Sequence, residues 1–400
     1  MELSLGKGAV LLLVAAVVAM LTRRLRLPYS VGLVAAGMGL AILPFSPKIS
    51  LTRELLFTAL LPPLIFETAF NLRWEKLRRE LALVVVLATA GVMVSAAVTA
   101  WGMHLLAHWQ LSSALVFGVL IAATDPVSVI ATFREAGVQG RLRMLVESES
   151  LFNDGTAAVA LGLAVTWAMG QQPNAGAAAG MLLLTLGGGI LCGVASALVA
   201  LFLMGRTQDH LVEMTFTMVA AYGSFLLADQ LQVSGVFATL MAGLIMGNFG
   251  GLGMLTDRGR EAVGAFWEFA AFAANSLVFL LIGMQQTSQN FVTAWRSTLA
   301  AIVLVTLGRA AAVYPICGLF FRSALRVPAR QQHVLFWGGL RGALALALAL
   351  GLPEAVPMRS EIVTASFAVV AFSVFGQGLT MPPVLRALGE LPANHSRVNR

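Results

Sequence analysis

The chain has 400 residues, of which 58% are hydrophobic and 11% are charged. Because charged residues make up about 25% of a typical soluble domain, this composition excludes a soluble globular protein and predicts a polytopic membrane protein. A formal net charge of +7 is also common in nucleic-acid-binding proteins, but the positions of the basic residues argue against that class.

The apolar runs between the charged clusters leave room for about thirteen membrane-spanning helices, since each span needs roughly 20 apolar residues. We therefore predict an all-α polytopic membrane protein with almost no soluble domain. The expected spans cover residues 8–22, 29–45, 54–70, 81–107, 111–133, 144–170, 178–204, 211–229, 233–249, 263–285, 295–321, 331–352 and 360–380.

Basic residues gather on one side of this arrangement. Of the 26 Lys and Arg residues, 19 fall in the odd-numbered connections and the C-terminal tail, five fall on the opposite side, and Arg309 and Arg341 lie within spans. Cytoplasmic loops of membrane proteins carry an excess of Lys and Arg. The pattern predicts an N-terminus outside and a C-terminus in the cytoplasm, and it explains the net charge without a nucleic-acid partner.

The densest polar group of the membrane part is the segment 147–155, which holds three carboxylates at the entrance and first turns of the sixth span. An ionised side chain at the centre of a membrane helix costs about 2.5–3.5 kcal/mol on insertion scales, so such residues usually face a wet cavity and have a function there. We expect Asp154 to bind a proton or a small cation alternately.

Helical geometry separates the polar residues of this span into two groups. Ser150 and Asp154 are four residues apart and share a face, whereas Glu149 and Asn153 form a neighbouring stripe. Glu149 and Asp154 are about 140° apart around the helix axis. We therefore expect Asp154 to face a break in the fifth span and Glu149 to find a cationic partner elsewhere.

The fifth span contains Thr124-Asp125-Pro126 in the middle of an apolar run. Pro126 lacks an N–H and disfavours helical geometry at Asp125, so the helix should break there. Asp125 could simply cap the half-helix that follows. A broken helix in the membrane is also where transporters coordinate ions, because main-chain carbonyls become free to bind a cation.

The third span carries Pro62-Pro63 followed by Glu67. The two prolines should kink the helix and release main-chain carbonyls. Glu67 follows one turn later, so it is either part of an intramembrane site or a carboxylate at the membrane surface, where the polar residues from Asn71 onward begin. The sequence leaves these two interpretations open.

Two arginines lie inside spans of the second half. Arg309 has no neighbouring acid, and since a buried guanidinium must be paired, Glu149 is the best candidate for its partner. Arg341 lies in the glycine-rich segment 338–342, which is a plausible second helix break. One broken helix in each half of the chain is the pattern of secondary transporters built from inverted repeats.

At these residues the chain resembles the monovalent cation/proton antiporter family, in its NhaP/NHE branch. The matching elements appear in family order across nearly the whole chain. They are Pro62-Pro63 with Glu67, Thr124-Asp125-Pro126-Val127, Glu149-Ser150-Leu151-Phe152-Asn153-Asp154, Gly338-Gly339-Leu340-Arg341-Gly342 and Gln377-Gly378-Leu379-Thr380. Each motif alone is weak, but together they are highly specific.

The resemblance implies a thirteen-helix, NhaA-like antiporter fold with inverted repeats, in which the fifth and twelfth spans cross as unwound segments. It further implies a homodimer. The dimerisation part would comprise about 1–80 and 205–285, and the core part about 81–170 and 295–385, with 178–204 as the linking helix.

The resemblance also assigns roles within the site. Asp154 and Asp125 would bind the ion, helped by Ser150, the Thr124 main chain and Glu67. Arg309 would be a structural arginine paired with Glu149. The pair Asn153-Asp154 resembles the electroneutral members of the family, and the absence of a long cytoplasmic tail suggests a bacterial-type protein of the inner membrane. No cofactor is implied.

We therefore expect exchange of one Na⁺ or Li⁺ for one H⁺. A K⁺/H⁺ antiporter remains an alternative, because oxygen ligands serve both cations. A cation channel would use the same acidic groups but would show uncoupled, voltage-driven flux. Paired carboxylates can also serve an intramembrane enzyme, but Asn153 and the arginine partner argue against it. A receptor or scaffold would leave the intramembrane carboxylates unexplained.

Overall fold

The computed structural model describes residues 5–25, 27–43, 52, 54–125, 130, 133, 138, 140–171, 174–249, 255–286 and 294–390, and all its regular elements within these ranges are helical. The α-helices are α1 (Leu5–Leu25), α2 (Tyr29–Ile42), α3 (Leu61–Asn71), α4 (Trp74–Val86), α5 (Val92–Ala107), α6 (Leu111–Leu120), α8 (Arg141–Ala168), α9 (Ala175–Met204), α10 (His210–Gln230), α11 (Gly235–Phe249), α12 (Asp257–Gln286), α13 (Trp295–Leu319), α14 (Ala329–Trp337), α15 (Ala343–Leu350), α16 (Arg359–Ala371) and α17 (Leu379–Ala387). Within the described ranges three segments are π-helical, namely η1 (Leu55–Leu60), η2 (Leu87–Gly91) and η3 (Phe372–Gly378).

Each of the thirteen predicted spans overlaps at least one of these helices. Seven helices in the described part of the chain are long and apolar enough to cross a membrane, and four shorter apolar helices have 10–17 residues. Fewer long apolar helices than predicted spans are present because several spans are interrupted or contain charged residues. The all-α membrane fold expected from the sequence is therefore present, with the interruptions as its main departure from simple spanning helices.

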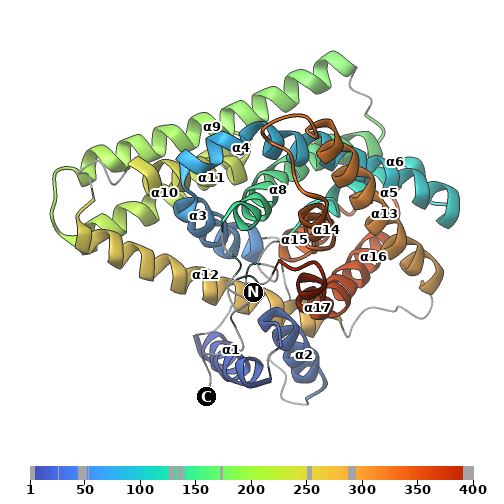
Figure 1. The fold of residues 1–400 in the computed structure, drawn as a ribbon, viewed down its shortest axis with the longest axis horizontal. Helices are drawn as coiled ribbons and strands as arrows, with labels where there is room; N and C mark the ends of the chain where they lie inside the picture. Colours follow the sequence, from blue (N-terminus) through green and yellow to red (C-terminus); the bar gives the residue numbers. More distant parts are fainter. Residues whose placement is uncertain are drawn as a thin grey trace.

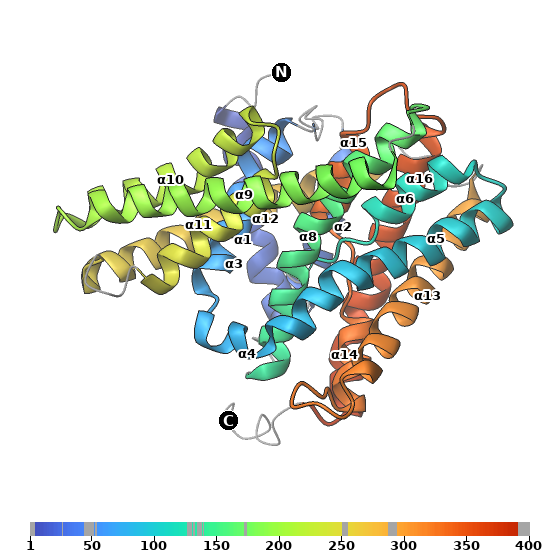
Figure 2. The same ribbon diagram turned by 90° about the horizontal axis from the view of Figure 1, so that it is seen from above.

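The helices form two groups with α8 between them (Figures 1 and 2). In one group α9, α10 and α11 pack on one another, α11 also packs on α3, and α12 packs on α2, α3 and α10. In the other group α5 packs against α6 and α13, while α13 and α15 contact α16. Helix α8 contacts members of both groups, including α6, α9 and α11, so its side chains are positioned by both.

The third predicted span changes helix type at its prolines. Segment η1 is π-helical up to Leu60, and α3 begins at Leu61, which places Pro62 and Pro63 in its first turn. The first N–H groups of an α-helix have no partner within the helix, so prolines cost little there. The two prolines thus lie at a π-to-α junction, which the sequence pattern did not predict.

Both expected helix breaks are present. Helix α6 ends at Leu120 and residues 123–125 are not helical, while residues 339–342 are a non-helical connection between α14 and α15. The two unwound segments lie against each other, since the Asp125 N–H donates to the Leu340 carbonyl over 2.7 Å. Pro126, the residue expected to cause the first break, lies outside the described residues.

Helices α2 and α12 cross at a contact between two glycines. A Cβ atom added to Gly37 would overlap the carbonyl oxygen of Leu280, and one added to Gly283 would overlap the carbonyl oxygen of Val34. Small residues allow membrane helices to approach closely in this way. The crossing fixes α12 against the N-terminal helices.

We predict that Gly37→Ala destabilises the protein, because the methyl group forces α2 and α12 apart; overpacking of this kind costs about 1–3 kcal/mol. The matched control is Gly39→Ala in the same helix, where an added Cβ meets no atom within 4 Å. The midpoint of thermal unfolding should fall for Gly37→Ala and should hold or rise for Gly39→Ala. Equal midpoints would contradict the close crossing.

Candidate functional site

The centre of α8 faces the unwound segment that follows α6. Asp154 is the middle residue of α8, 14th of 28, and Ser150 and Asn153 lie within one turn before it. Ser150 and Asn153 are buried, with exposed fractions of 1% and 0%. Both bond to Thr124 in the unwound segment, which brings together residues separated by nearly thirty positions in the chain.

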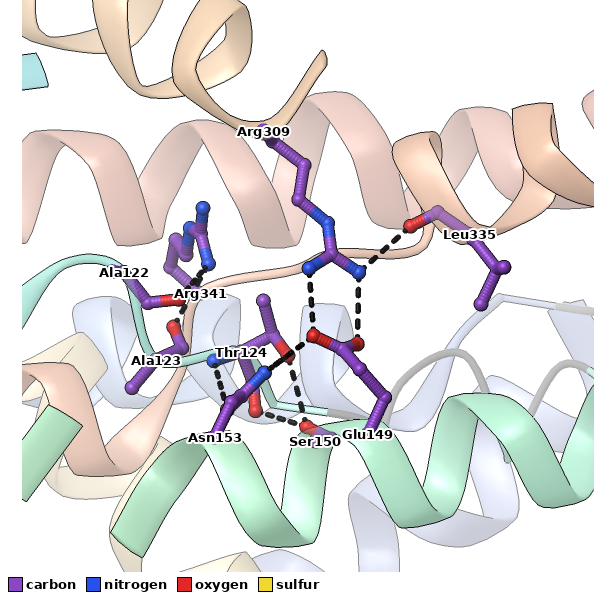
Figure 3. Close-up of polar contacts among 9 residues, drawn as sticks. All are labelled: Ala122, Ala123, Thr124, Glu149, Ser150, Asn153, Arg309, Leu335 and Arg341. Carbon is purple, nitrogen blue, oxygen red and sulfur yellow. Dashed lines mark hydrogen bonds and ion pairs between the residues drawn. The ribbon is translucent and has the colours of Figure 1, made fainter. Parts of the chain in front are cut away.

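Thr124 is held on α8 by a closed set of hydrogen bonds (Figure 3). The Ser150 hydroxyl donates to the Thr124 carbonyl, and the two hydroxyl oxygens are 3.1 Å apart. Asn153 Oδ1 accepts from the Thr124 N–H over 3.1 Å, and Asn153 Nδ2 donates to Thr124 Oγ1 over 2.6 Å. The main-chain groups released by the helix break are thus bound by side chains of α8, as buried polar groups require.

A cavity of about 1710 Å³ opens beside this network. Thr124, Asp125, Asp154 and Glu67 all line it. Asp154 Oδ1 is buried and has no hydrogen-bond partner among the described residues. Gly342 lies directly against the Asp125 carboxylate, because an added Cβ there would overlap Asp125 Oδ2. The cavity therefore brings the carboxylates of Asp154, Asp125 and Glu67 and both unwound segments together, and Glu147 and Glu268 also line it.

Glu67 belongs to this cavity from the opposite side, on α3. Its Oε1 accepts from Asn71 Nδ2 over 2.9 Å, and Thr68 Oγ1 lies 3.4 Å from its Oε2. Glu67 therefore combines features of both interpretations. It lies one turn from the polar end of α3, and its side chain lines the same cavity as Asp154.

Glu149 and Arg309 form a bidentate ion pair deep in the protein. Arg309 Nη1 and Nη2 donate to the two Glu149 oxygens over 2.8 and 2.9 Å, and the exposed fractions of the two residues are 2% for Glu149 and 8% for Arg309 (Figure 3). Nη2 also donates to the Leu335 carbonyl of α14 over 3.0 Å, and Asn153 Nδ2 donates to Glu149 Oε1 over 2.8 Å. The pair suggested by the sequence is present, and it ties α8, α13 and α14 together.

Arg341 binds the first unwound segment from the second. Its Nη1 donates to the carbonyls of Ala122 and Ala123 over 2.7 and 3.1 Å, and the residue is 2% exposed. These carbonyls lie where α6 has ended, so they lack helical partners. The Arg341 guanidinium in the second break therefore stabilises the partly negative carbonyl end of α6 at the first break.

The site thus unites Asp154, Ser150, Asn153 and Glu149 of α8 with residues of both breaks and with Arg309 of α13. Pro126 is the single expected residue outside the described part of the chain. The sequence pattern missed several polar residues of the cavity wall, among them Glu268 and Asn275 in α12. The signal was available, since Asn275 is the only amide in the apolar run from Phe269 to Met284.

We predict that Glu149→Gln destabilises the protein, because it leaves the buried Arg309 guanidinium without a counter-ion. Removal of one partner from a buried ion pair costs about 3–5 kcal/mol, so the thermal unfolding midpoint of the purified protein should fall clearly. Glu75→Gln is the matched control, since Glu75 pairs with Arg79 at 3.4 Å on an exposed surface, where pairs contribute about 0–1 kcal/mol. The account is wrong if both substitutions lower the midpoint equally.

Comparisons with known proteins place this geometry in a family. The family model described as sodium/hydrogen exchanger, transmembrane, matches residues 10–387. The chain is 40% identical over 368 residues to the Na⁺/H⁺ antiporter ApNhaP of Aphanothece halophytica, a match that covers 91% of this chain and 70% of that protein. It is 31% identical over 392 residues to the Na⁺/H⁺ antiporter NhaH of Halobacillus aidingensis, covering 95% and 96% of the two proteins.

The fold is similar to a solved structure as well. The sodium proton antiporter MjNhaP1 from Methanocaldococcus jannaschii at pH 8 superimposes with a TM-score of 0.76 at 20% sequence identity, over 96% of this chain and 98% of that one. The described fold is therefore the antiporter fold, in an integral membrane protein that is a transporter and not an enzyme. The chain belongs to the transmembrane sodium/hydrogen exchanger family.

Proposed function

We propose that the chain exchanges Na⁺ or Li⁺ for H⁺ across a bacterial inner membrane, with Asp154 as the group for which the two ions compete. The observation that carries the proposal is the buried Asp154 Oδ1, which has no hydrogen-bond partner among the described residues and lines the cavity beside the unwound segments. The names of the relatives, which describe Na⁺/H⁺ antiporters, support the same function.

The cation is bound by oxygen atoms around Asp154. Asp125 and Glu67 supply further carboxylates in the same cavity, and Ser150 and the Thr124 carbonyl supply neutral oxygens close to them. Oxygen ligands of this kind suit hard cations. The neutral amide of Asn153 adds no charge to the site. It stabilises the site through its hydrogen bonds to Thr124 and Glu149.

Competition between the two ions follows from burial. A low-dielectric environment favours the neutral form of a carboxyl group, whereas a bound cation favours the ionised form. Asp154 therefore binds either a proton or a metal cation. With neither bound, the site would carry uncompensated negative charge through the membrane, which is costly. The empty site crosses slowly, and the two fluxes become coupled.

One monovalent cation moves in each direction in this cycle, so the exchange is electroneutral. Asn153 next to Asp154 supports this stoichiometry, since a second carboxylate at that position would add a charge to the moving site. Glu149 is neutralised by Arg309 and takes no part in the exchange.

The cavity opens toward the cytoplasm in this arrangement. Its lining includes five basic residues that the sequence analysis assigned to the cytoplasmic side, namely Arg23, Arg73, Lys76, Arg143 and Arg386. The N-terminus then lies outside and the C-terminus inside. We further propose that the group of α10, α11 and α12 with the N-terminal helices forms a homodimer interface, and that the group of α5, α6 and α13, together with the intervening α8, moves relative to it.

We predict that Asp154→Asn abolishes cation/proton exchange while the protein remains folded, because the amide cannot release a proton or neutralise a cation. The measurement is proton efflux from acid-loaded proteoliposomes on addition of Na⁺, Li⁺ or K⁺ separately, which also reports ion selectivity. The exposed Asp229→Asn in α10 is the control. Exchange at the normal rate in Asp154→Asn would show that the site lies elsewhere.

We predict that the exchange rate is independent of membrane potential, since a one-for-one cycle moves no net charge. The test clamps the potential of proteoliposomes at several values with K⁺ and valinomycin and compares initial Na⁺/H⁺ exchange rates at a constant pH gradient. Rates that change systematically with the potential would exclude the one-for-one cycle.

A further inference from the structure

The cavity that contains Asp154 has two walls. One wall is formed by α8 and the two unwound segments, which carry Asp154, Asp125 and Gly342. The other wall is formed by α12 together with α1, α2 and α3. The polar groups of the second wall therefore face the same space from which a cation reaches Asp154.

Helix α12 lines the cavity along one stripe. Gly264, Glu268, Phe272 and Asn275 recur at intervals of three or four residues and all face the cavity. Of these four residues, Asn275 is the farthest from the start of α12 at Asp257. It lines the same cavity as Asp154.

The side chain of Asn275 is buried but makes no hydrogen bond to any described residue. Its exposed fraction is 7%, and its surroundings on α12 are apolar. The residue lines the cavity, so its amide is available to a water molecule or an ion there, and a polar group in such a place is stabilised by a hydrogen-bonding or coordinating partner. The adjacent Ser276 differs, because its hydroxyl contacts the Tyr29 hydroxyl at 2.7 Å and the Phe272 carbonyl at 2.5 Å.

We propose that Asn275 Oδ1 contacts the transported cation, or the water bound to it, from the α12 wall and thereby sets the apparent affinity for the cation. The inference rests on the proposed function and adds a residue outside the carboxylate set. A neutral amide oxygen can coordinate a hard cation without changing the charge of the site. Its contribution therefore leaves the one-for-one exchange intact.

The test compares the apparent KM for Na⁺ of the wild-type protein and of Asn275→Leu, a substitution of similar volume without polar atoms. Loss of one polar contact should raise the KM about three- to ten-fold, while the maximal rate is retained. Asn275→Asp keeps an oxygen at the same position and should have a KM at or below the wild-type value. Ser276→Ala is the matched control and should lower the unfolding temperature without changing the KM.

A KM for Asn275→Leu within two-fold of the wild-type value would overturn the inference, whatever the maximal rate, because a residue that only holds one conformation need not alter cation affinity. Asn275→Ala serves the same comparison if the Leu variant fails to fold. Absence of exchange in the wild-type protein would instead refute the proposed function. Exchange that requires Asp154 but is indifferent to Asn275 would refute this inference alone.

Discussion

A charge inside the membrane must be neutralised or hydrated, and the structure binds Glu149 and Arg341 to protein groups but leaves Asp154 open to an ion. Glu149 is neutralised by the bidentate Arg309. Arg341 donates hydrogen bonds to the carbonyls at the end of α6. Asp154 has one oxygen with no partner among the described residues. The two satisfied charges are structural, and the third is available to a transported ion.

The two helix breaks depend on each other. Ending α6 in the membrane leaves carbonyls and N–H groups without helical partners, which is costly. Arg341 and the Leu340 carbonyl of the second break bind some of these groups, and Asn153 and Ser150 of α8 bind Thr124. A change at any one of these partners would alter the position of Asp125 and the shape of the cavity. The first unwound segment therefore has a defined position, because hydrogen bonds from the second break and from α8 hold it.

The sequence predicted those features that depend on one segment or on the cost of a membrane charge. The breaks near Asp125 and Arg341 followed from proline and glycine chemistry, and the pairing of Arg309 with Glu149 followed from the need of a buried guanidinium for a counter-ion. The π-helical segments were missed because they shift hydrogen bonds by one residue without a distinctive composition. A cavity at Asp154 was expected, but most of its lining was not, because its walls come from helices far apart in the chain.

Asn153 makes one contact that its position in the helix predicted and others that depend on the fold. Its helical position placed it in the same stripe as Glu149, and it does donate to Glu149. It also bonds to both the main chain and the side chain of Thr124, which no spacing rule predicts because it depends on how the break is folded. One neutral amide thus links the structural ion pair to the segment that lines the ion cavity, and it does so without contributing charge.

The central claim is that a proton and a cation compete for one carboxylate, and the dependence of the apparent KM for Na⁺ on pH tests it most directly. Initial exchange rates are measured over a range of Na⁺ concentrations at several equal pH values on both sides of proteoliposomes. Competition predicts that the KM rises as the pH falls, approaching ten-fold per pH unit below the pKa of the site, while the maximal rate is reached at saturating Na⁺. A KM that is independent of pH, with a maximal rate that falls instead, would contradict a shared site.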